Sequence, residues 1–219
     1  MAPKYIWKPE SDRLKQLNLL LLLLGLTFSL LAQQARQYSF TQYTTADGLA
    51  SNHVNAVGQD KKGYIWLATT NGLNRFDGRD FLTFKHDPRN PNSLLSNNIG
   101  TMFCDSKGRI WILDENNRTG LFDGERFAFK EFPVDMPFDR FNLYNYSFFR
   151  EDWDGRIYLF MTGRGVYELD ETAQRFKLVD QKFGVPAGWT VLYFQPDLER
   201  KLYWFGCDSG MVKYEPHLN

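Results

Sequence analysis

Short runs rich in apolar residues, each bounded by turn residues, follow one another along most of the chain. In the first such unit the runs lie at 54–59, 64–69, 73–76 and 81–84, separated by 60–63, 70–72 and 77–78. Runs of this length between Asp-, Asn- and Gly-rich turns are typical of β-strands joined by tight hairpins. The pattern therefore predicts a unit of four antiparallel strands.

The turn between the first two runs recurs along the chain. The block 60–66, Asp-Lys-Lys-Gly-Tyr-Ile-Trp, returns at 105–111, at 152–158 and, degraded, at 197–203, in steps of 45, 47 and 45 residues. The repeated positions are Asp60, Gly63 and Trp66; Asp105, Gly108 and Trp111; Asp152, Gly155 and Tyr158; and Asp197 and Tyr203. A period of this size is typical of an array of small β-units. We expect the carboxylate to cap the turn and the aromatic residue to pack between neighbouring sheets.

The later units follow the same pattern. Units two and three each supply four runs, within 99–132 and 146–179, and unit four supplies three within 190–215. Residues 40–43 precede Ser-Asn as the last run of unit one does, so they are expected to supply the missing strand. The prediction is an all-β propeller of about four four-stranded blades, with the first at 54–84. Either the amino-terminal strand closes the ring, which would hide the sheet edges, or the chain is a fragment of a larger propeller.

The amino terminus has a different character. Four basic residues precede an apolar run at 19–31, which is followed by Ala32. The run is shorter than the roughly 18 residues that span a bilayer, and a small residue ends it, as in a signal peptide. We therefore predict a signal peptide at 1–32 and a periplasmic propeller at 33–219. An uncleaved inner-membrane anchor stays open, because Leu30 stands where a smaller residue usually precedes the cleavage site.

Charge and motif content exclude several classes of function. Lys and Arg together number 26, as do Asp and Glu, and no basic stripe is present, which argues against a nucleic-acid partner. The three histidines fall at unrelated offsets, and no nucleophile elbow, zinc motif or phosphate-binding loop is found. We expect no catalytic residue, no cofactor and no metal ion.

Several short motifs resemble those of a known family. They are Asp47-Gly48-Leu49, Ser51-Asn52, the Asp60-x-x-Gly-x-Ile-Trp66 block, Thr69, Asn71-Gly72-Leu73 and Phe76-Asp77-Gly78, and they resemble the two-component regulator propeller repeats. By periodicity the resemblance covers about 40–215. Such repeats form the exported sensor region of bacterial hybrid histidine kinases, notably in Bacteroidetes that detect glycan breakdown products. The resemblance implies a propeller that binds an oligosaccharide or another small molecule without turnover, with downstream sensor domains or a second copy as partners.

The chain also departs from the family pattern. Ala68 replaces a usual Gly, Asp114-Glu-Asn-Asn117 replaces a Thr-x-x-Gly turn, and Arg200 stands at the turn Gly of unit four. No kinase motif is present, so the kinase activity is not carried over and the chain is expected to be an amino-terminal portion of a larger sensor. Contact with a membrane would come only through an uncleaved amino terminus or a missing carboxyl-terminal part.

Variable loops carry the residues that we predict to bind ligand. With four antiparallel strands per unit, the second hairpins and the connections 85–98, 133–145 and 180–189 lie on one face, where loops on a rigid scaffold usually bind. The candidates there have donors or aromatic faces suited to a carbohydrate or a carboxylate: Arg118, Arg140, Tyr144, Arg164 and Trp189. A stand-alone protein-interaction scaffold and, less favoured, a propeller lyase or glycosidase remain alternatives.

Overall fold

The computed structural model describes residues 14–22, 39–136 and 146–216. The chain divides into two compact units, Met1–Gln42 and Tyr43–Asn219. In the first, residues 14–22 are helical, and their leucines are exposed. No helix among the described residues is both long and apolar enough to cross a membrane. Most of the predicted signal peptide lies outside the described residues.

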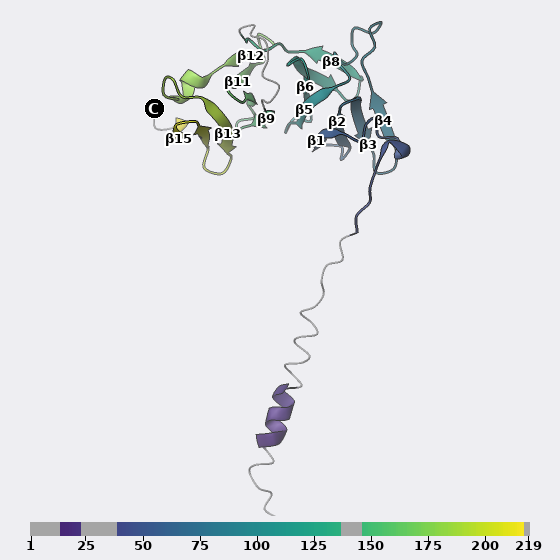
Figure 1. The fold of residues 1–219 in the computed structure, drawn as a ribbon, viewed down its shortest axis with the longest axis vertical. Helices are drawn as coiled ribbons and strands as arrows, with labels where there is room; N and C mark the ends of the chain where they lie inside the picture. The colour runs from purple at the N-terminus through teal and green to yellow at the C-terminus, as the bar shows by residue number, and fades with distance from the viewer. Residues whose placement is uncertain (1–13, 23–38, 137–145, 217–219) are drawn as a thin grey trace, which may run out of the picture. The chain divides into compact units, whose positions relative to one another are not determined.

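The second unit consists of four antiparallel sheets, so the predicted all-β propeller architecture is confirmed (Figure 1). Sheet 1 contains β1 (Val54–Gln59), β2 (Ile65–Thr69), β3 (Gly72–Phe76) and β4 (Phe81–Phe84); sheet 2 contains β5 (Ile99–Cys104), β6 (Ile110–Asp114), β7 (Thr119–Asp123) and β8 (Ala128–Glu131); sheet 3 contains β9 (Ser147–Glu151), β10 (Ile157–Met161), β11 (Gly165–Asp170) and β12 (Arg175–Leu178); and sheet 4 contains β13 (Val191–Asp197), β14 (Leu202–Cys207) and β15 (Gly210–Tyr214). Two short 3-10 helices are η1 (Thr45–Asp47) and η2 (Asp180–Phe183). The strands of sheet 1 begin and end within one residue of their predicted bounds, and the strands of the other sheets lie inside the predicted ranges 99–132, 146–179 and 190–215.

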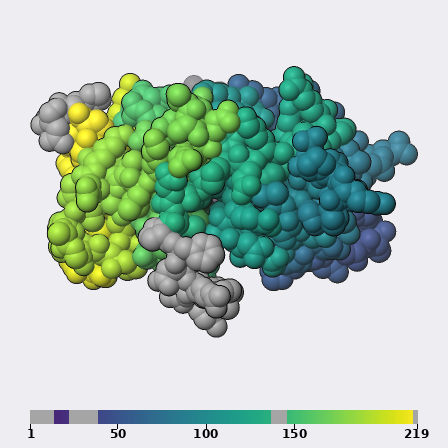
Figure 2. All heavy atoms as spheres, turned by 90° about the horizontal axis from the view of Figure 1, so that it is seen from above, coloured from purple at the N-terminus to yellow at the C-terminus, as the bar shows by residue number. Residues whose placement is uncertain are grey.

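Sequential strands are neighbours within every sheet, and sequential sheets are neighbours in the array. The first strands of the sheets contact one another in the order β1, β5, β9 and β13, so they form the inner edge, and β4, β8 and β12 are the strands furthest from it. In Figure 2 the colours run in order from blue to yellow across this unit, because each sheet borders the one before it. This up-and-down arrangement is the one that short hairpins enforce.

Three apolar clusters fill the spaces between consecutive sheets. Trp66 packs in the first cluster, Trp111 in the second, and Tyr158 with Tyr203 in the third. All four rings are fully or almost fully buried. The central strands β6 and β10 are buried at every position, because a sheet covers each of their two faces. In the described residues no cluster joins sheet 4 to sheet 1.

The predicted strand at 40–43 is wrong. Residues 39–44 carry no strand, and sheet 4 has three strands among the described residues. Thr44 begins a capping box instead: its hydroxyl accepts a hydrogen bond from the Ala46 N–H, and the Asp47 carboxylate accepts one from the Thr44 N–H. The Tyr43 ring packs on Phe76 and Phe81 of sheet 1, at centroid distances of 4.9 and 5.7 Å. The ring contacts hold Tyr43 against sheet 1, and the capping box forms the turn that follows it.

Candidate functional site

The repeated aspartate ties its turn to the core. In sheet 1, Asp60 Oδ1 accepts hydrogen bonds from the N–H groups of Lys62 and Tyr64, at 2.9 and 3.0 Å. Its Oδ2 accepts one from Trp66 Nε1 at 2.7 Å. Gly63 has a φ of +87°, which the turn needs and which other residues adopt at a cost. One carboxylate therefore caps the β1–β2 turn and fixes the ring buried below it.

The same carboxylate makes a different link in sheet 3. Asp152 Oδ2 accepts hydrogen bonds from two phenols, Tyr158 at 3.3 Å and Tyr203 at 2.7 Å, and the two hydroxyl oxygens are 3.1 Å apart. Tyr203 belongs to sheet 4, so this network crosses from one sheet to the next. Burial raises the pKa of both Tyr158 and Tyr203, because a phenolate there would lose its hydration beside a carboxylate. The network is a structural link that favours two neutral phenols.

A further turn of this type lies at the opposite end of sheet 2. Asp114 Oδ1 accepts hydrogen bonds from the N–H groups of Asn116 and Arg118, at 2.8 and 3.0 Å, and Asn117 takes a φ of +59° where the repeated turns of sheets 1 to 3 have Gly. The Arg118 guanidinium donates to Asp114 Oδ2 and to the Leu95 carbonyl, the latter at 2.8 Å. Arg118, predicted as a ligand-binding residue, therefore has its guanidinium engaged within sheet 2 and the connection before it.

The other predicted ligand-binding residues occupy separate places. Arg164 lies in the β10–β11 turn, with Nη1 4.0 Å from Met136 Sδ. Trp189 lies before β13, and its ring comes within 3.0 Å of where a side chain on Gly210 would begin. Arg140 and Tyr144 lie outside the described residues. Arg118, Arg164 and Trp189 thus lie on or beside three different sheets, and they stay predictions as ligand-binding residues.

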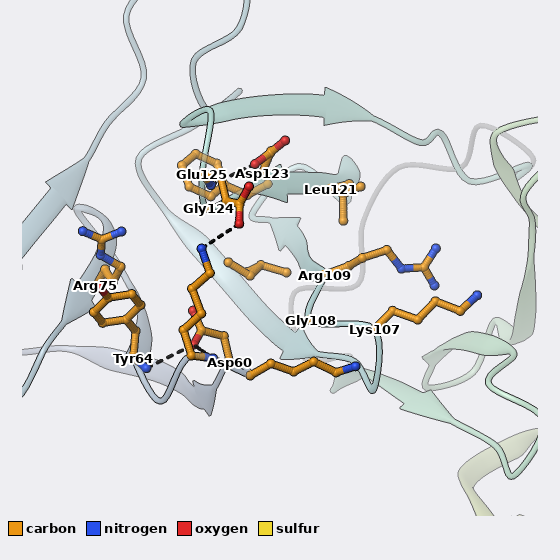
Figure 3. A pocket seen from close by; sticks show the side chains of 14 residues that line it. Asp60, Tyr64, Arg75, Lys107, Gly108, Arg109, Leu121, Asp123, Gly124 and Glu125 are labelled. Carbon is orange, nitrogen blue, oxygen red and sulfur yellow. Dashed lines mark hydrogen bonds and ion pairs between the residues drawn. The ribbon is translucent and has the colours of Figure 1, made fainter.

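A groove of about 410 Å³ lies at the other end of the sheets, between sheets 1 and 2. Three turns form it: the β1–β2 turn, the β5–β6 turn and the β7–β8 turn. Figure 3 shows Arg75 and Tyr64 on one side, Lys107 and Arg109 on the other, and Glu125 between them. Lys62 Nζ lies 2.6 Å from Glu125 Oε1, in an ion pair. The volume is within the range of small-molecule sites. The groove is our candidate functional site.

Cations outnumber carboxylates in the lining of the groove. The basic residues are Lys61, Lys62, Arg75, Lys107 and Arg109, and the acidic ones are Asp60, Asp123 and Glu125. Arg109 donates to Asp105 at 2.5 Å and to Glu171 at 2.9 Å, and although burial opposes its charge, these carboxylates raise its pKa. Its Nη2 is buried and has no hydrogen-bond partner among the described residues. The Arg75 guanidinium lies over the Tyr64 ring, 4.4 Å from its centroid.

The fold and its repeated turns define a class, the β-propellers built from four-stranded units. Two stretches of this chain, 48–71 and 93–116, match the two-component regulator propeller family model, and they contain the β1–β2 and β5–β6 turns. The chain therefore carries two-component regulator propeller repeats, as its motifs predicted. These two stretches supply two of the three turns that form the groove.

Known proteins agree with this assignment. A 69-residue stretch is 38% identical to histidine kinase P4 of Formosa agariphila, which is 32% of this chain and 5% of the kinase. The fold is similar to the extracellular domains of two candidate hybrid two-component systems of B. thetaiotaomicron. For BT3049 the TM-score is 0.61 at 19% identity, over 80% of this chain and 26% of that one; for BT4673 the values are 0.57, 20%, 84% and 27%. The chain thus spans about a quarter of the length of these structures.

The groove was not among the sites predicted from the sequence. Its lining residues come from four separate stretches, 60–64, 75, 107–110 and 121–125, and no local motif joins them. The Asp114 turn, in contrast, has a sequence signal: Asp114, Asn117 and Arg118 have the spacing of Asp105, Gly108 and Arg109. A search for that spacing with Asn in place of Gly would have found it, because Asn tolerates the left-handed region.

Proposed function

We propose that this chain is the ligand-sensing propeller of an exported two-component sensor, and that it binds an oligosaccharide or another small molecule without turnover. The observation that carries this proposal is the groove between sheets 1 and 2, formed in part by the two repeats that match the family model. A groove at a junction between two sheets suits a sensor, because a bound ligand contacts both sheets and favours one arrangement of them over others.

The proposal also gives the cellular location of the chain and its partners. The B. thetaiotaomicron relatives are extracellular domains, which supports export of this chain to the periplasm after removal of residues 1–32. We propose that the chain is the amino-terminal portion of a longer sensor, in which further sensor domains or a second copy receive the signal. The catalytic step of signalling would then belong to another part of that sensor.

A thermal-shift screen tests the proposal. The full chain is heated with oligosaccharides of different composition, each at a concentration well above the expected Kd. A true ligand at 100 times its Kd should raise Tm by about 5–10 °C, since it stabilises the folded state by roughly 2.7 kcal/mol. Glycerol at the same osmolality is the control. Absence of a shift with every oligosaccharide would contradict the sugar-sensor function, and a ligand recovered in cleaved form by mass spectrometry would contradict binding without turnover.

Exposed apolar side chains on sheet 4 favour a second candidate, a protein-interaction scaffold. Leu192 and Met211 are 47% and 68% exposed, and Met211 points away from the cluster between sheets 3 and 4. Under this candidate the surface binds a second copy of the chain. Light scattering should then show dimers at high protein concentration, and Leu192→Lys with Met211→Lys should abolish them. A monomer at every concentration would remove this candidate.

A further inference from the structure

We infer that the groove between sheets 1 and 2 binds the anionic groups of an acidic saccharide, either carboxylates or sulfates. This inference rests on the proposed sensor function and names the class of its ligand. Five cationic side chains line the groove against three carboxylates. The charge count alone does not decide the matter, because the availability of each group depends on its partners.

The carboxylates of the groove already have donors. Asp60 accepts three hydrogen bonds from its own turn and from Trp66. Asp123 Oδ1 accepts two, from the N–H groups of Glu125 and Arg126, at 2.8 and 3.0 Å. The Arg126 N–H contributes most to lowering the pKa of Asp123, which stays ionised. These two carboxylates hold turns together. Because their oxygens already accept hydrogen bonds from the protein, their strongest acceptor positions are not available to a ligand.

Two of the cations are available. No ion pair joins Lys61 or Arg75 to any carboxylate among the described residues. The Arg75 guanidinium lies over the faces of Tyr64 and Phe127, at 4.4 and 5.5 Å from their centroids. Stacking of this kind restricts the guanidinium to one plane while its N–H edges can still donate, which suits bidentate contact with a carboxylate or a sulfate.

Lys61 extends from sheet 1 toward sheet 2. Its methylene carbons lie 3.5 to 3.7 Å from the position where a side chain on Gly108 would begin. The stem therefore packs on the β5–β6 turn, and the ammonium group is displayed at the junction, in the way long basic side chains cover apolar surface. A ligand held by Lys61 and Arg75 contacts the groove at two separate places in the lining.

The Lys62–Glu125 ion pair is an exchangeable contact in the groove. The side chains are 61% and 72% exposed, and the N–O distance is 2.6 Å. An exposed pair of this kind contributes little stability, because water and salt screen it. A ligand carboxylate or sulfate can therefore replace Glu125 on Lys62 at small cost, which gives a third cationic contact.

The rest of the lining suits the sugar ring. Ile110, Leu121 and Phe122 supply an apolar part of the groove. Sugar rings have apolar C–H faces together with polar edges, so they need this combination of an apolar wall and a few charged groups. A free inorganic anion would use the cations and leave the apolar wall without a contact.

Calorimetric titration of the full chain tests the inference with matched probes. The probes are trisaccharides of galacturonate, glucuronate and mannuronate, a sulfated trisaccharide, the neutral trisaccharide that corresponds to each, and sodium sulfate alone. We expect at least one acidic trisaccharide to bind about tenfold or more tighter than its neutral counterpart, with affinity that falls as salt is added. Sulfate alone should bind more weakly than that trisaccharide.

Substitutions locate the binding in the groove. Arg75→Gln and Lys61→Gln should each weaken the acidic trisaccharide by about tenfold, since each removes one charged contact. Arg79→Gln is the matched control, because Arg79 is exposed on the β3–β4 turn and does not line the groove. Lys61 is exposed, so its replacement keeps the fold even where Arg75→Gln lowers Tm.

The outcomes separate this inference from the proposed function. Equal binding of acidic and neutral trisaccharides, or full affinity in both Arg75→Gln and Lys61→Gln, overturns the acidic groove while a sugar sensor stands. If neutral oligosaccharides stabilise the chain and no acidic trisaccharide binds, the acidic groove is likewise overturned while the sugar sensor stands. If no oligosaccharide binds in either experiment, both the inference and the proposed sugar sensor are wrong.

Discussion

The junction between sheets 1 and 2 and the junction between sheets 3 and 4 share one repeated turn and differ in what covers it. At the first, Asp60 and Trp66 bond within sheet 1, and the space beside them is the groove. At the other, Tyr203 of sheet 4 donates to Asp152 of sheet 3, and the Trp153 ring lies 4.8 Å from the Tyr203 ring. The aspartate and the buried aromatic residue are thus alike at the two junctions. The Trp153 ring covers the junction between sheets 3 and 4, whereas the junction between sheets 1 and 2 contains the groove.

The residue after the repeated aspartate differs from sheet to sheet. This position is Lys61 in sheet 1, Ser106 in sheet 2 and Trp153 in sheet 3, and each side chain reaches the next sheet. Lys61 packs on the Gly108 turn, the Ser106 hydroxyl donates to Glu151, and the Trp153 ring packs at a tilt against the Tyr203 ring. One position per repeat, next to the repeated aspartate, therefore supplies a different contact at each junction: a lysine stem beside the groove, a polar contact, or an aromatic ring.

Removal of the shared carboxylate should have the largest effect. Asp152→Ala leaves two phenols and the turn N–H groups without their acceptor in a site where the carboxylate is fully buried. We expect a loss of about 3–5 kcal/mol in the free energy of unfolding, measured by urea titration. Asp154→Ala in the same turn is the control and should cost less than about 0.5 kcal/mol, because that side chain is half exposed. Equal effects would mean that the network does not stabilise this junction.

The second-largest effect should come from alkaline pH, which weakens the junction between sheets 3 and 4. The pKa of Tyr158 and of Tyr203 is raised in the folded state, so the stability from their neutral forms is complete below about pH 10 and is lost as the pH rises further. Between pH 10 and 11.5 we expect the free energy of unfolding to fall by about 1 kcal/mol per pH unit per phenol. Urea titrations over this range measure the slope. A Tyr203→Phe variant with the same slope as the parent would contradict this assignment.

Loss of one hydroxyl should have a smaller effect at neutral pH. Tyr203→Phe keeps the buried ring and removes the bond to Asp152, so we expect a cost of about 1–2 kcal/mol. Tyr193→Phe removes a hydroxyl from a residue that is 48% exposed and should be close to neutral. Urea titration compares the two variants. A Tyr203→Phe protein as stable as the parent would show that Tyr158 alone satisfies Asp152.

A substitution in the groove between sheets 1 and 2 should have the smallest effect on stability. Glu125→Gln breaks the ion pair with Lys62, which is exposed and screened, so we expect no measurable change in Tm. The same substitution leaves Lys62 free for a ligand anion and should increase the affinity for an acidic trisaccharide two- to threefold in calorimetry. A large fall in Tm would mean that this ion pair is a structural link between sheets 1 and 2.

The strands were predictable from the sequence because short apolar-rich runs and Asp-Gly turns depend on local residues alone. The amino-terminal strand was wrong: 40–43 has aromatic residues at both ends and precedes Ser-Asn as 81–84 does, but Thr44 and Asp47 form a capping box and Tyr43 packs on sheet 1. The pair Thr44 and Asp47 has capping-box spacing, so a signal was present. A local likeness in sequence does not decide whether a segment pairs as a strand or packs on the sheet through its side chains.

The groove could not be predicted in the same way. Lys61, Arg75 and Arg109 come from different strands and turns, and their meeting depends on which turn tips of two neighbouring sheets face each other. The repeat also drew attention to Asp60 and Trp66 as scaffold and away from Lys61, which is one position along. A repeat identifies its invariant residues directly. The function of its variable residues becomes clear only when their position beside the neighbouring sheet is known.

The hydrogen bond from Tyr203 to Asp152 makes the units unequal as modules. The Trp66 and Trp111 side chains bond to carboxylates of their own sheets, so those anchors would be carried along if either sheet were transferred to another propeller. Sheet 4 would leave behind the acceptor for its central tyrosine. Exchange of sheets 3 and 4 as a pair keeps this bond, and exchange of sheet 4 alone requires a host whose preceding sheet supplies an equivalent carboxylate.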